Sequence, residues 1–185
     1  AGYPASCSCE PSTAVTVSHL RPGEVKQLIF GDASGSLHVW EGPGRERTGF
    51  PFRSGFAVQS QPVLGDLNDD GVFEIIYGSE DFKIYAVDSN AKALAGFPVS
   101  TGYRIYSTPA LADLDGDGIV EIIVTSGDGN LYVFDGRGVV RNGFPVKIGS
   151  RLQSSPVVGD VDLDGKPEIA ATADDGRLWL LKADG

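Results

Sequence analysis

Three acidic segments of this chain share one pattern of residue types. Each has an oxygen-bearing side chain at its first, third and fifth positions, a glycine at the sixth and a glutamate at the ninth. The segments are residues 66–74, 113–121 and 160–168, so that their first residues lie 47 positions apart. Oxygen ligands on a tightly turned loop suit a hard cation such as calcium. The pattern therefore predicts a repeat protein with several calcium-type sites.

We predict one site in each segment, with the second, third and fourth repeats of the chain holding one ion apiece. The candidate side-chain ligands are Asp66, Asn68, Asp70 and Glu74; Asp113, Asp115, Asp117 and Glu121; and Asp160, Asp162, Asp164 and Glu168. The candidate carbonyl ligands, at the seventh positions, are those of Val72, Ile119 and Lys166. The glycine permits the sharp turn. Soft metals would favour Cys or His, which these loops lack. An EF-hand is disfavoured, because its glutamate stands at position 12.

The repeat extends beyond the acidic segments. A Gly-Phe-Pro element recurs at residues 49–51, 96–98 and 143–145, and a Gly-Tyr-Pro element stands at residues 2–4. The copies are residues 2–48, 49–95, 96–142 and 143–185. A period of 40 to 50 residues with several short strand-like runs is typical of β-propeller blades. We predict an all-β fold: a single domain over residues 1–185, with four repeats of about 47 residues that form four-stranded antiparallel blades.

The strands of one blade can be placed from pattern and turn chemistry. In the last copy we expect strands at 154–158, 167–171 and 177–181, with Asp175-Gly176 as the tight turn before the third. By analogy with residues 139–147, the fourth strand would contain the Gly-Phe-Pro element. The chain opens on such an element and ends after a third strand. Its first strand is therefore expected to complete the last blade, either its own or that of a neighbouring molecule.

The acidic loop, preceded by a Pro-x-x-Gly/Ala-Asp strand, resembles the FG-GAP/VCBS repeat family, whose best-known members form the propeller of integrin α subunits. The resemblance covers nearly the whole chain and is most specific over residues 61–75, 108–122 and 155–169. It implies that the loop joins the first two strands of a blade and binds calcium. It also implies a secreted or cell-surface protein that serves in adhesion, in carbohydrate-associated proteins or as a scaffold. Such propellers commonly have about seven blades, and four repeats are present here.

The first copy departs from the pattern. His19, Arg21, Gly23 and Gln27 stand where the second copy has Asp66, Asn68, Asp70 and Glu74. A basic side chain and a cation in one pocket would repel each other, so we predict no metal in the first repeat. Arg21 either supplies the missing positive charge or extends into solvent.

Composition excludes several classes of function. The formal charge of −10 disfavours a nucleic-acid partner, which would need a basic patch. No run of about 18 apolar residues is present, so no membrane span is predicted. The sequence contains no methionine. We therefore expect a processed mature form or an excised domain, and favour removal of a signal peptide and a secreted, extracellular or cell-surface location.

The cysteines and histidines give little sign of catalysis. Three states are open for Cys7 and Cys9: free thiols, an unusual local disulfide, or cross-links to another chain. A metal site at this Cys-x-Cys pair is disfavoured, because further cysteine ligands are lacking. His38 lies in a strand-like run, where packing is expected, and His19 is the other histidine. No nucleophile elbow, phosphate loop or zinc spacing is present. We predict that the chain is not an enzyme.

The leading hypothesis is a calcium-stabilised extracellular β-propeller that acts as a structural or adhesive interaction module. Its expected partners are a protein or a glycan at the cell surface, or copies of itself that assemble through terminal strand exchange. The alternative is a glycan-binding module. Its candidate stacking residues are Tyr3, Tyr103, Tyr106, Trp40 and Trp179.

Overall fold

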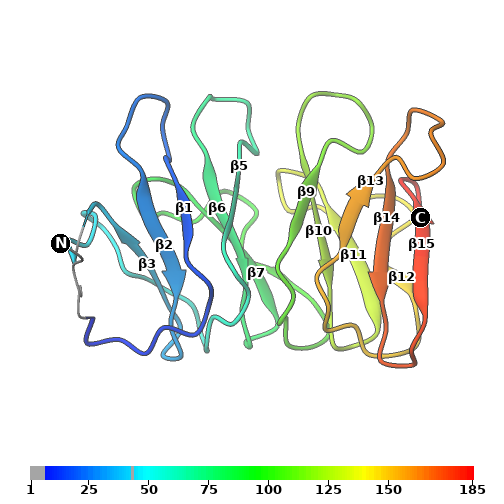
Figure 1. The fold of residues 1–185 in the computed structure, drawn as a ribbon, viewed down its shortest axis with the longest axis horizontal. Coiled ribbons are helices and arrows are strands. Elements are labelled where there is room, and N and C mark those ends of the chain that lie inside the picture. The colour runs from blue at the N-terminus through cyan, green and yellow to red at the C-terminus, as the bar shows by residue number, and fades with distance from the viewer. Residues whose placement is uncertain (1–6, 43) are drawn as a thin grey trace.

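The computed structural model describes residues 7–42 and 44–185. These residues form fifteen β-strands and, within the described ranges, no helix. Figure 1 shows four sheets that stand side by side in a row, in the order of the chain. The described residues therefore include no helix that is long and apolar enough to cross a membrane.

Each sheet is built from consecutive strands, and we number the sheets one to four along the chain. Sheet one contains β1 (Thr16–Ser18), β2 (Gln27–Gly31), β3 (Ser36–Trp40) and β4 (Phe52–Arg53). Sheet two contains β5 (Val63–Gly65), β6 (Glu74–Gly78), β7 (Lys83–Val87) and β8 (Val99–Ser100). Sheet three contains β9 (Ala110–Ala112), β10 (Glu121–Thr125), β11 (Asn130–Phe134) and β12 (Val146–Lys147). Sheet four contains β13 (Val157–Gly159), β14 (Glu168–Thr172) and β15 (Leu178–Lys182).

The predicted all-β fold is confirmed, and neighbouring strands within each sheet are antiparallel. The second and third strands of the last copy begin one residue later than expected, and its first strand begins three residues later. The turn at Asp175-Gly176 forms as predicted: the N–H of Gly176, at φ 81°, donates to the carbonyl oxygen of Ala173 over 3.0 Å.

The expectation for the fourth strand was wrong in its extent. In sheet three that strand covers only Val146–Lys147, and the Gly-Phe-Pro element lies in the turn before it. Gly143 has φ 89°, and a side chain there would collide with the carbonyl oxygen of Asp184. Only glycine meets both demands. The phenylalanine that follows packs into a core cluster, as Phe50 and Phe97 do in their repeats.

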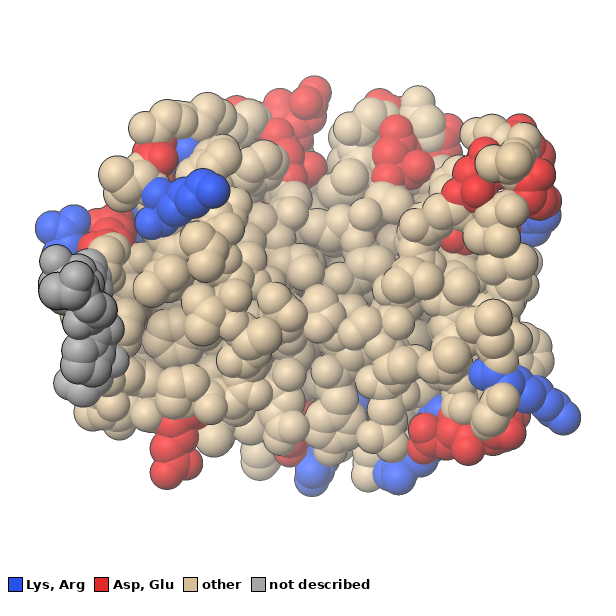
Figure 2. Space-filling view, in the orientation of Figure 1, with Lys and Arg blue, Asp and Glu red and all other residues tan. Residues whose placement is uncertain are grey.

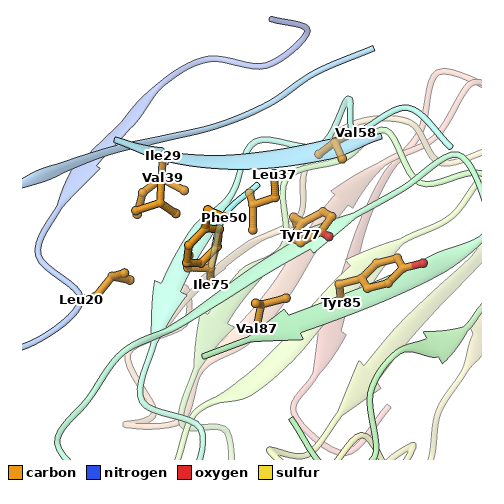
Figure 3. Close-up of a cluster of buried hydrophobic side chains, with 10 residues drawn as sticks. All are labelled: Leu20, Ile29, Leu37, Val39, Phe50, Val58, Ile75, Tyr77, Tyr85 and Val87. Atoms are coloured by element: carbon orange, nitrogen blue, oxygen red, sulfur yellow. The ribbon is translucent and has the colours of Figure 1, made fainter. Parts of the chain in front are cut away.

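The hydrophobic core lies between neighbouring sheets rather than within one of them. Three clusters of buried side chains occupy the three sheet-to-sheet contacts. In the cluster of Figure 3, Ile29 and Val39 from sheet one face Ile75 and Val87 from sheet two. The inner strands of sheets two and three are apolar on both faces, because each face packs on a different neighbour.

The two ends of the row remain apart. Sheets one and four lie at opposite ends in Figure 1, so the four sheets do not close into a ring in this structure. The strand expected at residues 2–4 lies outside the described residues, and sheet four has three strands within them. Val17 of sheet one and Leu178 and Leu180 of sheet four, on the outward faces, are exposed. Both end faces are thus available to further sheets.

Candidate metal centre

The three acidic loops occupy equivalent places in sheets two, three and four. Each joins the first strand of its sheet to the second: β5 to β6, β9 to β10 and β13 to β14. Figure 1 shows these connections along one edge of the row, and Figure 2 shows acidic side chains gathered along that edge. The 47-residue period therefore brings all three predicted sites to the same side of the molecule.

The first aspartate of each loop folds the loop around its own carboxylate. Asp113 accepts backbone hydrogen bonds from Gly116 over 2.7 Å and from Gly118 over 2.9 Å. The hydrogen bond from Gly118 is the main cause that lowers the pKa of this carboxyl. Asp66 and Asp160 likewise accept from the loop glycines Gly71 and Gly165 over 2.8 and 2.9 Å. The sixth-position glycines have positive φ angles, a conformation that suits the sharp turn.

The closing glutamate of each loop is buried and bound to the loop backbone. Glu74, Glu121 and Glu168 accept from the N–H groups of Leu67, Leu114 and Val161 over 2.9, 2.8 and 2.9 Å. These three glutamates are 1, 4 and 2% exposed, respectively. In the first repeat, Gln27 accepts the same hydrogen bond from Leu20 over 3.1 Å. An uncharged side chain can therefore hold the loop in this way. The negative charge of the glutamate is not needed for the loop hydrogen bond.

In repeats three and four the structure brings three carboxylates together. Asp113, Asp115 and Glu121 form one group, and Asp160, Asp162 and Glu168 form another; in each group the candidate ligand oxygens lie within 4.8 Å of one another. The fifth-position aspartates lie outside these groups. Asp117 and Asp164 instead accept the N–H groups of Ile119 and Lys166, both over 2.8 Å. The carbonyl ligands of the three loops remain predictions.

Repeat three contains a basic side chain at the acidic loop that the repeat pattern did not indicate. Arg141 pairs with Asp115 over 3.0 Å and, through Nη1, with Glu121 over 2.8 Å. Burial raises the pKa of Glu121, and Arg141 opposes that rise. Nη1 is buried and has no aligned hydrogen-bond partner among the described residues. The guanidinium therefore neutralises the carboxylates while the N–H groups of Nη1 lack a hydrogen-bond acceptor. Arg47 occupies the same position of the first repeat, 94 residues earlier. This recurrence of arginine is the feature of the sequence that could have indicated a role for Arg141.

Repeat four contains a basic side chain of different origin. Lys182, at the end of β15, places Nζ 2.9 Å from Asp162, 3.4 Å from Asp164 and 3.0 Å from Glu168. Its hydrogen bond to Asp162 lowers the pKa of that aspartate, and the same pairing raises the pKa of Lys182. This ammonium group is half exposed, so water screens its ion pairs.

In repeat two, none of the ion pairs of the described residues involves the acidic loop. Leu94 stands where repeat three has Arg141, and Asp88 stands where repeat four has Lys182. Burial raises the pKa of Glu74 to about 7, and the charges of Asp70, Asp66 and Asp88 act in the same direction.

Beside these groups lies a cavity of about 350 Å³. Its lining includes the oxygen-bearing residues Asn68, Asp70, Glu74 and Asp88 and the basic residues Arg21 and Lys92. A hard cation needs such oxygen donors. Of the three loops, this one therefore has carboxylates that none of the described ion pairs neutralises.

The first repeat is organised without a carboxylate cluster at the corresponding positions. Arg21 is exposed, and its Nε and Nη2 atoms donate to the hydroxyl of Ser89 in sheet two over 3.2 and 3.0 Å. Of the two alternatives, solvent exposure describes this side chain better than replacement of an ion. The absence of metal from repeat one remains a prediction.

Comparison with known proteins confirms the resemblance. Residues 113–171 match the family model described as FG-GAP-like repeat, which covers the acidic loops of repeats three and four. None of the curated proteins matches the chain. Among solved structures, the Vibrio cholerae biofilm matrix protein Bap1 is 17% identical, with a TM-score of 0.72 over 93% of this chain and 27% of Bap1.

Two further structures show the same architecture. The WD40 β-propeller domain of Doa1 is 14% identical, with a TM-score of 0.62 over 91% of this chain and 51% of that one. BBS1N, solved in complex with ARL6DN, is 13% identical, with a TM-score of 0.66 over 98% of this chain and 56% of that one. The chain thus spans about a quarter of Bap1 and about half of the other two. The β-propeller arrangement is confirmed, and each sheet is a propeller blade.

Proposed function

We propose that this chain is a calcium-stabilised β-propeller module that acts outside the cell in structural or adhesive interactions. The observation that carries the proposal is the second acidic loop. There, burial raises the pKa of Glu74, the charges of three nearby aspartates raise it further, and none of the ion pairs of the described residues neutralises these carboxylates. A cation is the group that would relieve this repulsion, and the oxygen donors favour a hard ion such as calcium.

The residues of the chain would act by holding the loops. The first aspartate and the glutamate of each loop already bind its backbone at both ends. A bound calcium ion would supply positive charge to these carboxylates. It would thereby link the first two strands of the blade. The ions are therefore proposed as structural elements, and no catalytic role is assigned to any residue.

The interaction part of the proposal draws on the structural relatives. Bap1 is a protein of the biofilm matrix, and BBS1N was solved with a protein partner. The exposed apolar faces of blades one and four offer surfaces for the blades of other copies of the chain. We propose a protein at the cell surface, or another copy, as the partner. Sedimentation velocity measures the second possibility, and a single monomeric species at all concentrations would contradict it.

Calcium removal tests the proposal directly. Adding calcium to EDTA-treated protein at about one hundred times the dissociation constant of one site should stabilise the fold by about 2.7 kcal/mol. For a chain of this length that is roughly 5–10 °C in melting temperature, measured by scanning calorimetry. Magnesium at the same concentration is the control, because it binds poorly to large flexible oxygen sites. An unchanged melting temperature in calcium and in EDTA would overturn the proposal.

Glycan binding is a second candidate, and one feature on the opposite edge of the blades favours it. Phe82 has φ 70°, at a position where the other three repeats have Gly35, Gly129 and Gly176. A bulky residue in this conformation costs about 1–3 kcal/mol and is often found at functional sites. Phe82 is 40% exposed and stacks on Tyr103, with ring centroids 5.5 Å apart. Arg151 lies over the Tyr103 ring, 5.5 Å from its centroid.

The variant Phe82→Gly tests this candidate with the residue found in the other repeats. It should keep or raise the melting temperature, because glycine adopts this backbone conformation without cost. If the stack binds glycans, glycan-array signals should fall at least about tenfold. Phe56→Ser removes an exposed aromatic residue outside the stack and should leave the signals unchanged. Equal loss in both variants, or none in either, would contradict a site at Phe82 and Tyr103.

A further inference from the structure

The outward face of blade one carries a group of residues that the calcium loops do not use. Blades two, three and four turn the corresponding face toward the blade before them. In blade one the segment that begins at Cys7 crosses this face. The N–H of Ala33 donates to the carbonyl oxygen of Glu10 over 2.9 Å, and Pro11 pairs with Asp32. The cysteines are thereby held against β3 and the turn before it.

Cys7 and Cys9 are joined to each other by a disulfide, which selects the local bridge among the three states considered from sequence. Their sulfur atoms and a ring nitrogen of His38 lie within 4.8 Å of one another. Together with Asp32, Glu46 and other residues they line a cavity of about 720 Å³. A Cys-x-Cys pair lacked a further ligand in the sequence, and the fold supplies one from a position 29 residues away.

His38 is held in place by two carboxylates. Its Nδ1 atom lies 2.8 Å from Glu46 and its Nε2 atom 3.2 Å from Asp32. The residue is 8% exposed, and its ring stacks on Phe30 with centroids 5.0 Å apart. A carboxylate behind a histidine fixes the tautomer and the orientation of the ring, which is the usual arrangement around metal-bound histidines. Either Glu46 or Asp32 can keep its contact with one ring nitrogen of His38 while the other ring nitrogen binds a metal ion.

The cysteine pair also has a feature that suits thiolates. The N–H of Cys9 donates to Sγ of Cys7 over 3.0 Å. A hydrogen bond to the charged form of a group stabilises that form. Two thiolates and one imidazole form a donor set of the borderline-soft kind, which binds zinc in preference to calcium. Three protein ligands leave a fourth position open toward the cavity, for water or for a nearby carboxylate.

We propose that reduction of the Cys7–Cys9 disulfide creates a zinc site made of the two cysteine thiolates and the imidazole of His38. A thiol reductant supplies two electrons and two protons, and leaves as its own disulfide. Zinc then displaces the two thiol protons, and any proton carried by the coordinating imidazole nitrogen. On the ion the sulfur atoms would lie about 3.7 Å apart, as tetrahedral Zn–S distances of about 2.3 Å require. The oxidised chain has no such site, because its sulfur atoms are bonded to each other.

Cobalt(II) is the probe that separates this site from the acidic loops. Thiolate-bound cobalt gives a sulfur-to-metal charge-transfer band that oxygen ligands do not give, and excess calcium occupies the loops. Protein reduced with a phosphine and titrated with cobalt in calcium should develop this band with a stoichiometry of one, and zinc should remove it. The oxidised protein should show no band. A reduced protein without the band, or an oxidised protein with it, would overturn the proposal.

Two histidine variants complete the test. His38→Gln should weaken cobalt and zinc binding at least about tenfold in the reduced protein, since it removes one of three ligands. His19→Gln is the matched control, because His19 lies outside the metal group, and it should bind as the unaltered protein does. Near-ultraviolet circular dichroism confirms that both variants are folded. Equal affinity in His38→Gln and His19→Gln would show that the histidine is not a ligand and would refute the three-residue site.

Discussion

Glu74→Gln is expected to stabilise the calcium-free protein at pH 8 and to remove most of the calcium response of repeat two. Burial and the charges of Asp66, Asp70 and Asp88 raise the pKa of Glu74 from 4.5 to about 7 in the folded state. At pH 8 the folded chain therefore holds a buried charge that costs up to about 3 kcal/mol. Glutamine removes the charge, and Gln27 shows that glutamine can accept the same loop hydrogen bond.

The pH dependence of this difference follows from the direction of the shift. Below pH 4.5, Glu74 is protonated in the folded and unfolded states and imposes no charge cost. Between pH 4.5 and about 7 the unfolded chain ionises first, so the calcium-free protein loses stability as the pH rises. Melting curves in EDTA at pH 5 and pH 8 should therefore diverge for the unaltered protein. They should lie closer together for Glu74→Gln, with a gain of roughly 5–10 °C at pH 8.

Asp69→Asn is the matched control for this experiment. Asp69 lies in the same loop, is exposed and has φ 57°, a conformation that asparagine also adopts. The variant removes one negative charge without touching the predicted ligands. It should retain the calcium response and the pH dependence of the unaltered protein. If Glu74→Gln and Asp69→Asn gave parallel melting curves, the burial of Glu74 would not be the cause.

Arg141→Leu is expected to make repeat three dependent on calcium. Leucine is the residue of repeat two at this position, Leu94. Its introduction leaves Glu121 buried without the guanidinium that lies 2.8 Å away. Loss of one partner of a buried pair costs about 3–5 kcal/mol, and the partial exposure of Arg141 reduces this to about 2–3 kcal/mol. The variant should melt roughly 5–10 °C lower in EDTA, and calcium should restore most of the loss.

Two further variants test the same explanation: the reciprocal substitution Leu94→Arg and the surface control Arg137→Leu. Leu94→Arg should reduce the calcium response of repeat two, because its guanidinium would pair with the carboxylates there. Its melting temperature in EDTA also reflects the loss of Leu94 from the core cluster between sheets two and three. Arg137→Leu removes an arginine that is 90% exposed and lies 3.8 Å from Asp135, and it should change stability little. A fall in melting temperature for Arg141→Leu that calcium does not reverse would contradict a cation site at Asp115 and Glu121.

Most of the fold could be predicted because its information is local and repeated. The strands follow from short apolar runs. The Asp-Gly turn and the first aspartate of each loop form hydrogen bonds with residues only a few positions away. The same holds for Glu74, Glu121 and Glu168, which return to the backbone seven residues earlier. The spacing of such residues is fixed by the loop itself, so it can be read from the sequence.

The features that could not be predicted depend on contacts between distant residues. Arg141 meets Asp115 from 26 positions away, and Lys182 meets Asp162 from 20 positions away. These two basic residues occupy different positions of the repeat. No shared pattern in the sequence therefore indicated that they pair with the acidic loops. His38 joins the cysteines only because the chain folds back across blade one. The length of the fourth strand depended on the turn at Gly143, whose φ angle the pattern did not reveal.

The Gly-Phe-Pro turns determine how the molecule can be divided. Each turn lies at the start of one sequence copy, yet the short strand after it completes the sheet of the copy before. A cut at a copy boundary would thus remove the outer strand from one blade and leave that strand unpaired on the other fragment. Neighbouring blades also share their apolar core. The row should therefore unfold as one cooperative unit. A fragment that keeps every blade whole would begin after β4, β8 or β12 rather than at a copy boundary.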